Sequence, residues 1–70
     1  MNKEEIKAIR NHLDETQAIF ARRLRVTSTT ISRWECGKAS PDLINRMKLR
    51  RLAATYGLLL EVPDGNASPS

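Results

Sequence analysis

The chain has 70 residues, of which 40% are hydrophobic and 29% charged, and its formal net charge is +4. This length allows one domain, and the composition is that of a small globular protein, not of a disordered acidic tail or a membrane protein. A domain of this size buries only about 60% of the surface of its unfolded chain, which leaves little room for the deep pocket of a metabolic enzyme.

Three short helices are predicted in the first half of the chain. Apolar residues recur at helical spacing over residues 3–13, 17–24 and 28–35. Thr16 and Thr27 are suitable N-caps for the second and third segments, because a threonine hydroxyl accepts a hydrogen bond from a backbone N–H that the first turn leaves unpaired. We therefore expect a helix in each range, with short turns between them.

A fourth helix is predicted to begin at Ser40-Pro41, with the serine as cap and the proline at the first helical position, where its missing N–H costs nothing. The helical pattern continues over residues 42–56. Gly37 suits the left-handed conformation that ends the third helix. Gly57 is predicted to end or bend the fourth helix.

The apolar residues of the fourth helix fall into two stripes. One stripe consists of Leu43, Ile44 and Met47, and the other of Leu49, Leu52, Ala53 and Tyr56. One of them can pack on the core while the other faces a partner. The expected architecture is a compact all-α domain of four to five helices over residues 1–62, followed by a polar tail over 63–70.

Positive charge is concentrated in the middle of the chain. Residues 21–51 contain nine basic and two acidic residues, a balance of +7, whereas the remainder sums to −3. Such a segment attracts a polyanion, and nucleic acid is the obvious candidate. In the alternative interpretation, these residues are only solvent-exposed side chains on the helix surfaces, without a binding role. No segment combines a basic face with a bulky apolar face, so no membrane partner is expected.

Residues 17–36 have the pattern of a helix-turn-helix motif, in which two short helices flank a turn of about three residues. The positions that can share one core are Phe20, Ala21, Leu24, Val26, Ile31 and Trp34. The run TQAIFARRL, followed by VTSTTISRWE and GKASP, resembles the DNA-binding domain of the Cro and lambdoid phage repressor family, also called the Xre-type family. The resemblance covers roughly residues 6–56. It implies a lambda-repressor-like fold.

The resemblance implies that the second helix of the motif lies in the major groove of DNA and that its N-terminal residues reach base edges. The candidate base contacts are Ser28, Thr29, Ser32 and Arg33. Arg33 is expected to be the most selective of them, because a guanidinium can bind guanine O6 and N7 together. In the alternative interpretation, Arg33 contacts only a phosphate.

Three further residues are candidate phosphate contacts by the same resemblance. The family uses a glutamine at the position of Gln17 to bind a phosphate and to brace the recognition helix, and Thr27 and Lys38 resemble additional phosphate contacts. Thr27 can also act as a cap alone. Both roles are compatible, because the hydroxyl can cap the helix while a backbone N–H faces the phosphate.

The family often pairs an arginine of the first helix with a glutamate at the end of the recognition helix, which implies an ion pair between Arg10 and Glu35. Glu35 would then hold the helices in register and would not be a catalytic acid. In one departure from the family, Arg25 stands where a glycine with positive φ is common, at a cost of about 1 kcal/mol. A separate oligomerisation domain is not expected, so the spare stripe of the fourth helix, with residues 58–60, is the candidate dimer surface.

The expected function is a sequence-specific transcriptional regulator, a repressor that binds double-stranded DNA with a palindromic sequence as a homodimer. One alternative is the antitoxin of a toxin-antitoxin pair, in which residues 58–65 bind a toxin protein. Another is a protein-protein interaction module without specific DNA binding. An enzyme is not expected, because no nucleophile, base and orienting group can be named together.

Metal and cofactor sites are not expected either. Cys36 is the only cysteine and His12 the only histidine, so the usual nitrogen and sulfur ligands of zinc cannot be assembled. The glycines are isolated and form no phosphate-binding loop. The unpaired cysteine and the polar start of the chain favour a reducing, cytoplasmic setting.

Overall fold

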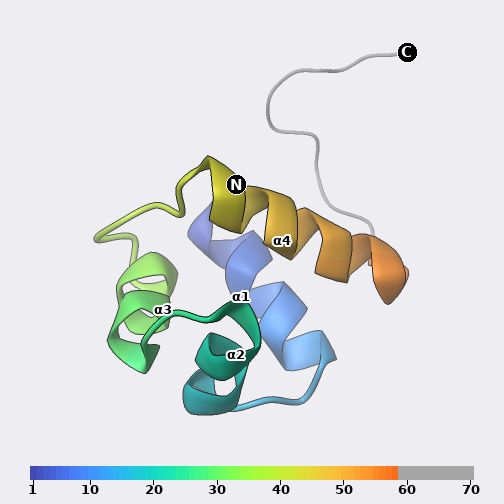
Figure 1. The fold of residues 1–70 in the computed structure, drawn as a ribbon, viewed down its shortest axis with the longest axis horizontal. Helices are drawn as coiled ribbons and strands as arrows, with labels where there is room; N and C mark the ends of the chain where they lie inside the picture. Colours follow the sequence, from blue (N-terminus) through green and yellow to red (C-terminus); the bar gives the residue numbers. More distant parts are fainter. Residues whose placement is uncertain (59–70) are drawn as a thin grey trace.

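Four helices make up most of residues 1–58, the part of the chain that the computed structural model describes (Figure 1). They are α1 (Lys3–His12), α2 (Gln17–Leu24), α3 (Ser28–Glu35) and α4 (Leu43–Thr55). Since residues 1–58 contain no strand, the predicted all-α class is confirmed. The predicted domain end at residue 62 and the predicted polar tail lie outside the described residues.

Side-chain caps begin the first three helices. Thr16 and Thr27 each accept a hydrogen bond, at 3.2 Å, from the backbone N–H three residues further on, so both predicted N-caps are confirmed. Helix α1 begins with a reciprocal capping box, in which Asn2 Oδ1 accepts from Glu5 N at 2.8 Å and Glu5 Oε1 accepts from Asn2 N at 3.0 Å. Each cap satisfies an N–H that the helix itself leaves unpaired.

The predicted start of the fourth helix is wrong. Helix α4 begins at Leu43, and its N-cap is Asp42, whose Oδ1 accepts from Asn45 N at 2.9 Å. Serine and aspartate side chains can both accept this hydrogen bond. The negative charge of the Asp42 carboxylate also interacts favourably with the positive end of the helix dipole, and a neutral serine hydroxyl lacks that charge. Ser40 and Pro41 therefore lie in the connection before the helix, where Pro41 is buried.

The hydrophobic core lies between the four helices. Helices α2 and α3 pack closely against each other, and α1 contacts both α3 and α4. The buried hydrophobic residues are Ile6, Ile9, Phe20, Ala21, Leu24, Ile31, Trp34, Leu49 and Ala53. All the apolar positions predicted to join α2 to α3 belong to this core or, in the case of Val26, pack against it.

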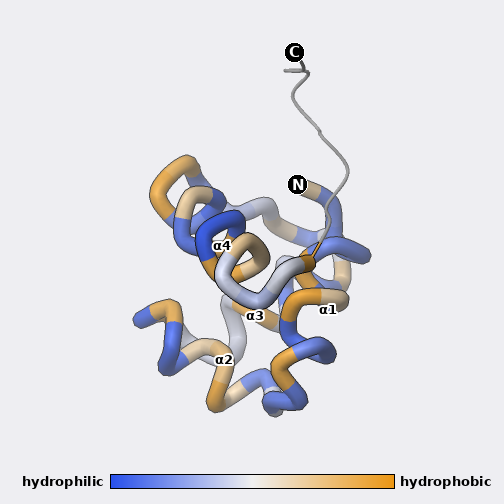
Figure 2. Tube along the Cα trace, turned by 90° about the vertical axis from the view of Figure 1, so that its right-hand side faces the viewer, coloured by the Kyte–Doolittle hydropathy of each residue, from blue (hydrophilic) through white to orange (hydrophobic). Residues whose placement is uncertain are grey.

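The two apolar stripes of α4 have different surroundings. Leu49 and Ala53 are buried in the core, whereas Leu43, Ile44 and Met47 remain 59%, 60% and 53% exposed. In Figure 2, hydrophobic segments of α4 accordingly lie on the outside of the molecule as well as toward the other helices. The prediction that only one stripe packs on the core is confirmed within residues 1–58, except that Tyr56, assigned to the buried stripe, is 46% exposed.

Left-handed residues terminate α2 and α3. Arg25 has φ 62° and Gly37 has φ 77°, so the expected positive φ is confirmed at both positions. After Arg25 the chain turns back, and Val26 N donates to Ala21 O at 3.0 Å. After Gly37, Lys38 N donates to Arg33 O at 2.9 Å. These bonds satisfy carbonyl groups at the ends of both helices and fix the direction in which each helix enters the next connection.

Candidate nucleic-acid interface

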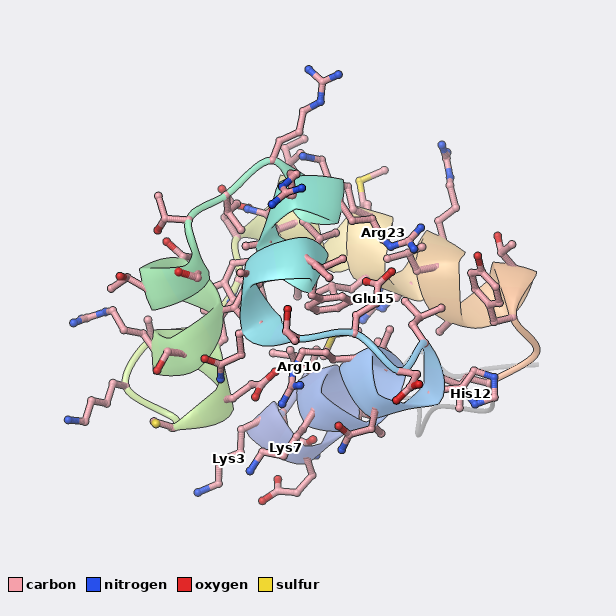
Figure 3. All side chains as sticks on the ribbon, turned by 90° about the horizontal axis from the view of Figure 1, so that it is seen from below. Lys3, Lys7, Arg10, His12, Glu15 and Arg23 are labelled. Carbon is pink, nitrogen blue, oxygen red and sulfur yellow. The ribbon has the colours of Figure 1, made fainter. Side chains whose placement is uncertain are left out.

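Helix α3 has one buried face and one polar face. Ile31 and Trp34 anchor it in the core, at 0% and 4% exposure. The four candidate base contacts lie on the opposite side as two pairs with helical i, i+4 spacing, Ser28 with Ser32 and Thr29 with Arg33. Ser28, Thr29 and Arg33 are exposed and Ser32 is half-buried. In Figure 3, side chains of α3 project away from the other helices.

The N-terminus of α3 is ordered by hydroxyl groups. Thr27 Oγ1 accepts from Thr30 N and lies 2.9 Å from Thr30 Oγ1, so the Thr27 hydroxyl is engaged within the helix start. The first backbone N–H groups of the helix have no carbonyl partner inside it and point outward from its N-terminus. An anion at this end would therefore meet N–H groups and the positive end of the helix dipole. Sequence reasoning missed Thr30, although its spacing from Thr27 was visible.

Arg10, Gln17 and Glu35 form a polar network that joins α1, α2 and α3. Arg10 Nε and Nη2 donate to the two carboxylate oxygens of Glu35 at 2.6 and 2.9 Å. Gln17 Nε2 donates to Glu35 Oε1 at 3.1 Å. Gln17 thus contacts α3 directly. Because Glu35 is at the end of α3, the network fixes the orientation of this helix relative to the two helices before it.

The network keeps the Glu35 carboxylate charged. Burial alone would raise the pKa of Glu35, but the hydrogen bonds from Arg10 and Gln17 and the nearby positive charges outweigh it, so its pKa is lowered. The hydrogen bond to Glu35 in turn raises the pKa of Arg10. A carboxylate whose oxygens are occupied in this way holds helices together and is not available to transfer a proton.

A second ion pair extends the network toward α2. Arg10 Nη1 donates to the Glu15 backbone carbonyl at 3.0 Å, and the Glu15 side chain forms an ion pair with Arg23 (Figure 3). Hydrogen bonding to Glu15 raises the pKa of Arg23. Arg23 is thus used in part to hold the α1–α2 connection against α2. The pairing joins residues of two segments whose relative position the sequence did not specify.

The basic residues that flank α3 have different environments. Lys38 is exposed just after the helix, on the segment that Gly37 redirects, and it therefore lies at the opposite end of α3 from Ser28. Lys48 turns inward, where its Nζ donates to the Leu24 carbonyl at the end of α2 at 3.0 Å. This cation interacts favourably with the negative end of the α2 dipole. Sequence reasoning missed this role of Lys48.

No cluster of three or more His, Cys, Asp and Glu side chains within residues 1–58 could hold a metal ion. No helix in the same range is long and apolar enough to span a bilayer.

Comparison with known proteins identifies the family. A family model described as helix-turn-helix matches residues 6–61, which include all four helices except the first turn of α1. Searches of curated proteins and of solved structures give no match. The family's domain binds DNA and is regulatory, not catalytic. Because the match spans most of the chain, and α2 and α3 are two packed short helices joined by a three-residue connection, this chain belongs to the Cro/C1-type helix-turn-helix family of DNA-binding transcription regulators.

Proposed function

We propose that this protein is a repressor that recognises a specific double-stranded operator through α3. The observation that carries the proposal is the division of α3 into a face locked in the core by Ile31 and Trp34 and an exposed face of hydroxyl and guanidinium groups. A helix held in this way can be inserted into the major groove without losing its orientation. The surplus of positive charge in residues 21–51 supports a polyanionic partner.

The side chains of α3 have distinct roles in this proposal. Arg33 binds guanine O6 and N7 and supplies most of the selectivity. Ser28, Thr29 and Ser32 form hydrogen bonds to base edges and tolerate more than one base, because a hydroxyl both donates and accepts.

Phosphate contacts set the position of α3 in the groove. Gln17 lies at the start of α2 and Thr27 at the start of α3, where backbone N–H groups favour an anion. Lys38 contributes a positive charge at the other end of α3. These groups carry no sequence information and add affinity that falls with salt.

The proposed operator is palindromic. Two copies of the domain bind half-sites about one helical turn, or roughly 34 Å, apart, because a two-fold symmetric dimer presents its two recognition helices to successive major grooves. A single domain of this size has few side chains that reach bases, so the dimer supplies the length of sequence needed for selectivity.

Fluorescence anisotropy with labelled DNA tests this function. The probe is the DNA upstream of the protein's own gene, compared with a scrambled duplex of the same length and composition, at rising salt. The proposal predicts tighter binding to the upstream DNA and a steep loss of affinity with salt for both duplexes. Equal and weak binding to both would contradict specific recognition.

Two alanine variants separate base contacts from phosphate contacts. Arg33→Ala should relax selectivity at one base pair, by about 1–3 kcal/mol. Lys38→Ala is the matched control, because it removes an exposed cation next to the same helix. It should weaken binding to all sequences alike. It should also reduce the slope of the logarithm of the binding constant against the logarithm of the salt concentration by about one. If Arg33→Ala behaves like Lys38→Ala, then Arg33 contacts only a phosphate.

A further inference from the structure

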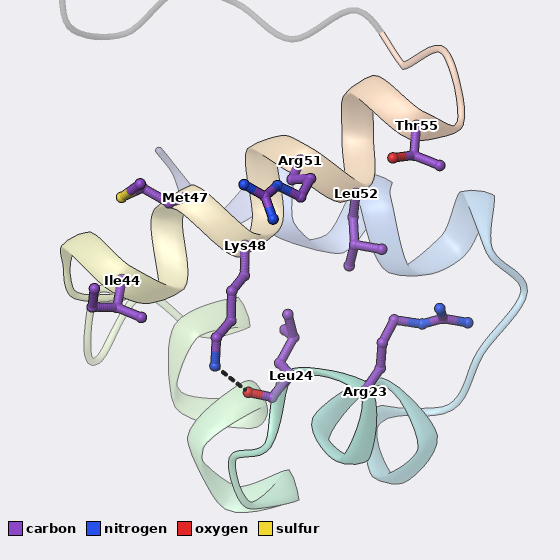
Figure 4. Close-up of a pocket in the computed structure, with 8 residues that line it drawn as sticks. All are labelled: Arg23, Leu24, Ile44, Met47, Lys48, Arg51, Leu52 and Thr55. Carbon is purple, nitrogen blue, oxygen red and sulfur yellow. Dashed lines mark hydrogen bonds between the residues drawn. The ribbon is translucent and has the colours of Figure 1, made fainter.

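A groove runs between the C-terminal end of α2 and α4 (Figure 4). It has a volume of about 370 Å³, and side chains from both helices line it. Its apolar part consists of Leu24, Ile44, Met47 and Leu52, and its basic part includes Lys48 and Arg51. None of the roles proposed above for DNA binding uses this groove.

The groove includes apolar side chains that lie outside the buried core and remain exposed. Ile44 and Met47 are 60% and 53% exposed, although both belong to an apolar stripe of α4. A contiguous exposed apolar patch marks an interaction site. Direct pairing of α4 with α4 of a second copy would bring Lys48 and Arg51 of both chains together, and like charges oppose such pairing. The chemistry of the groove therefore favours an occupant that is both apolar and acidic.

One segment of the sequence has this chemistry. Residues 59–64 are Leu-Leu-Glu-Val-Pro-Asp, with apolar residues, two acids and no basic residue. The other acidic segments differ: Glu4 and Glu5 stand between lysines, and Glu15 is already paired with Arg23. Six extended residues reach about 20 Å, which is also the length of a helix of 13 residues such as α4.

The described chain ends on the core side of α4, away from the groove. Leu58 N donates to Ala53 O at 2.8 Å, and Leu58 packs against the core. Ala53 faces the core, whereas Thr55 faces the groove, and residues two apart on a helix lie about 200° apart around its axis. Leu58, the last described residue, therefore lies on the side of α4 opposite the groove. A second copy presents its groove without this restriction.

We propose that residues 59–64 of one chain bind the α2–α4 groove of a second copy, with Leu59, Leu60 and Val62 against Ile44 and Met47 and with Glu61 beside Arg51. Two such contacts, related by two-fold symmetry, hold the dimer. This inference deepens the proposed function and rests on its dimer, for which it names the interface.

Charge exchange in the full-length chain tests the interface, with the oligomeric state measured by analytical ultracentrifugation in the absence of DNA. The wild type should be a dimer. Arg51→Glu and Glu61→Lys should each weaken dimerisation at least tenfold, because each places like charges together. An equimolar mixture of the two variants should form a heterodimer, since both of its contacts then join opposite charges. Arg22→Glu, which changes an exposed arginine of α2 outside the groove, is the matched control and should leave the dimer intact.

Circular dichroism confirms that each variant is folded. Should Arg51→Glu unfold, Met47→Glu takes its place, because Met47 is 53% exposed and the new acid also opposes Glu61. A wild-type chain that stays monomeric overturns the inference. So does a Glu61→Lys chain that dimerises like the wild type, which would indicate direct pairing of α4 with α4. A mixture that stays monomeric shows instead that the segment does not bind a second copy.

Failure of this inference is distinguishable from failure of the proposed function. A monomeric Arg51→Glu chain keeps α3 unchanged and should still prefer a single half-site over scrambled DNA in the anisotropy assay. Loss of the dimer with retained preference supports both proposals. A chain without preference in any oligomeric state contradicts the proposed function alone.

Discussion

Replacing Arg10 with methionine should destabilise the fold strongly. The change removes two hydrogen bonds to Glu35 and one to the Glu15 carbonyl. The Glu35 carboxylate, in a residue that is only 5% exposed, then keeps its hydrogen bond from Gln17 but has lost its cationic partner. Removing one partner of a buried ion pair costs about 3–5 kcal/mol. The Arg10 side chain is 17% exposed, so we expect the lower end of this range, about 3 kcal/mol. That is a large fraction of the roughly 4–10 kcal/mol that stabilises a domain of this size.

The loss should depend on pH with a definite sign. In the wild type, burial of Glu35 is outweighed by its hydrogen bonds, and its pKa lies below the ordinary value of 4.5. The ionised group therefore stabilises the fold above pH 4.5, and this contribution is lost as the pH falls through the lower, folded pKa. In Arg10→Met, burial is no longer outweighed, so the pKa of Glu35 should rise above its unfolded value. Protonation of Glu35 at low pH then removes the unpaired buried charge from the variant. The difference in unfolding free energy between the variant and the wild type therefore becomes smaller.

Urea unfolding, followed by circular dichroism at pH 7 and at pH 4, measures both effects. The double variant Arg10→Met/Glu35→Met is the control, since it leaves no buried charge behind and should be more stable than Arg10→Met alone. A difference in unfolding free energy that is equal at the two pH values, or one below about 1 kcal/mol at pH 7, would contradict a large cost of leaving Glu35 buried without Arg10.

Three further variants test local features by thermal unfolding. Gly37→Ala places a Cβ in a left-handed residue with φ 77°, 3.4 Å from Lys3 Cδ, and should cost about 1 kcal/mol; a neutral result would mean that the turn relaxes. Arg25→Gly should instead stabilise the fold by about 0.5–1 kcal/mol, because glycine adopts φ 62° without strain; lower stability would contradict this. Lys48→Met should cost about 1–2 kcal/mol through the lost hydrogen bond to the Leu24 carbonyl, and an unchanged Tm would show that water replaces it.

Features that depend on neighbouring residues were predictable from the sequence. The Thr16 and Thr27 caps each involve a side chain and a backbone N–H three residues away, so the starts of α2 and α3 follow from local chemistry. The left-handed Arg25 was expected from the family resemblance. The start of α4 was mispredicted because Ser40 and Asp42 are both acceptable caps, and the helix begins after Asp42, whose carboxylate also interacts with the helix dipole.

Contacts between distant segments were harder to predict. Lys48 and Leu24 are 24 positions apart, and nothing in either residue type indicates that an ammonium group will meet that carbonyl. The same holds for Arg23 with Glu15, which depends on how the α1–α2 connection folds. Arg10 and Glu35 were paired only through the resemblance. The exposure of Ile44 and Met47 required the structure, because the sequence could not tell which of two apolar stripes faces the core.

The location of the DNA-binding surface is tested most directly by an NMR titration of the labelled protein with its upstream duplex. We predict that amide shifts change at the starts of α2 and α3, along the exposed face of α3 around Arg33, and at Lys38. The amide shifts of the α4 residues that line the groove, such as Ile44 and Met47, should change little, provided that the protein has the same oligomeric state with and without DNA. Shifts confined to the α4 groove, or no shifts at saturating DNA, would contradict the claim that α3 binds the DNA.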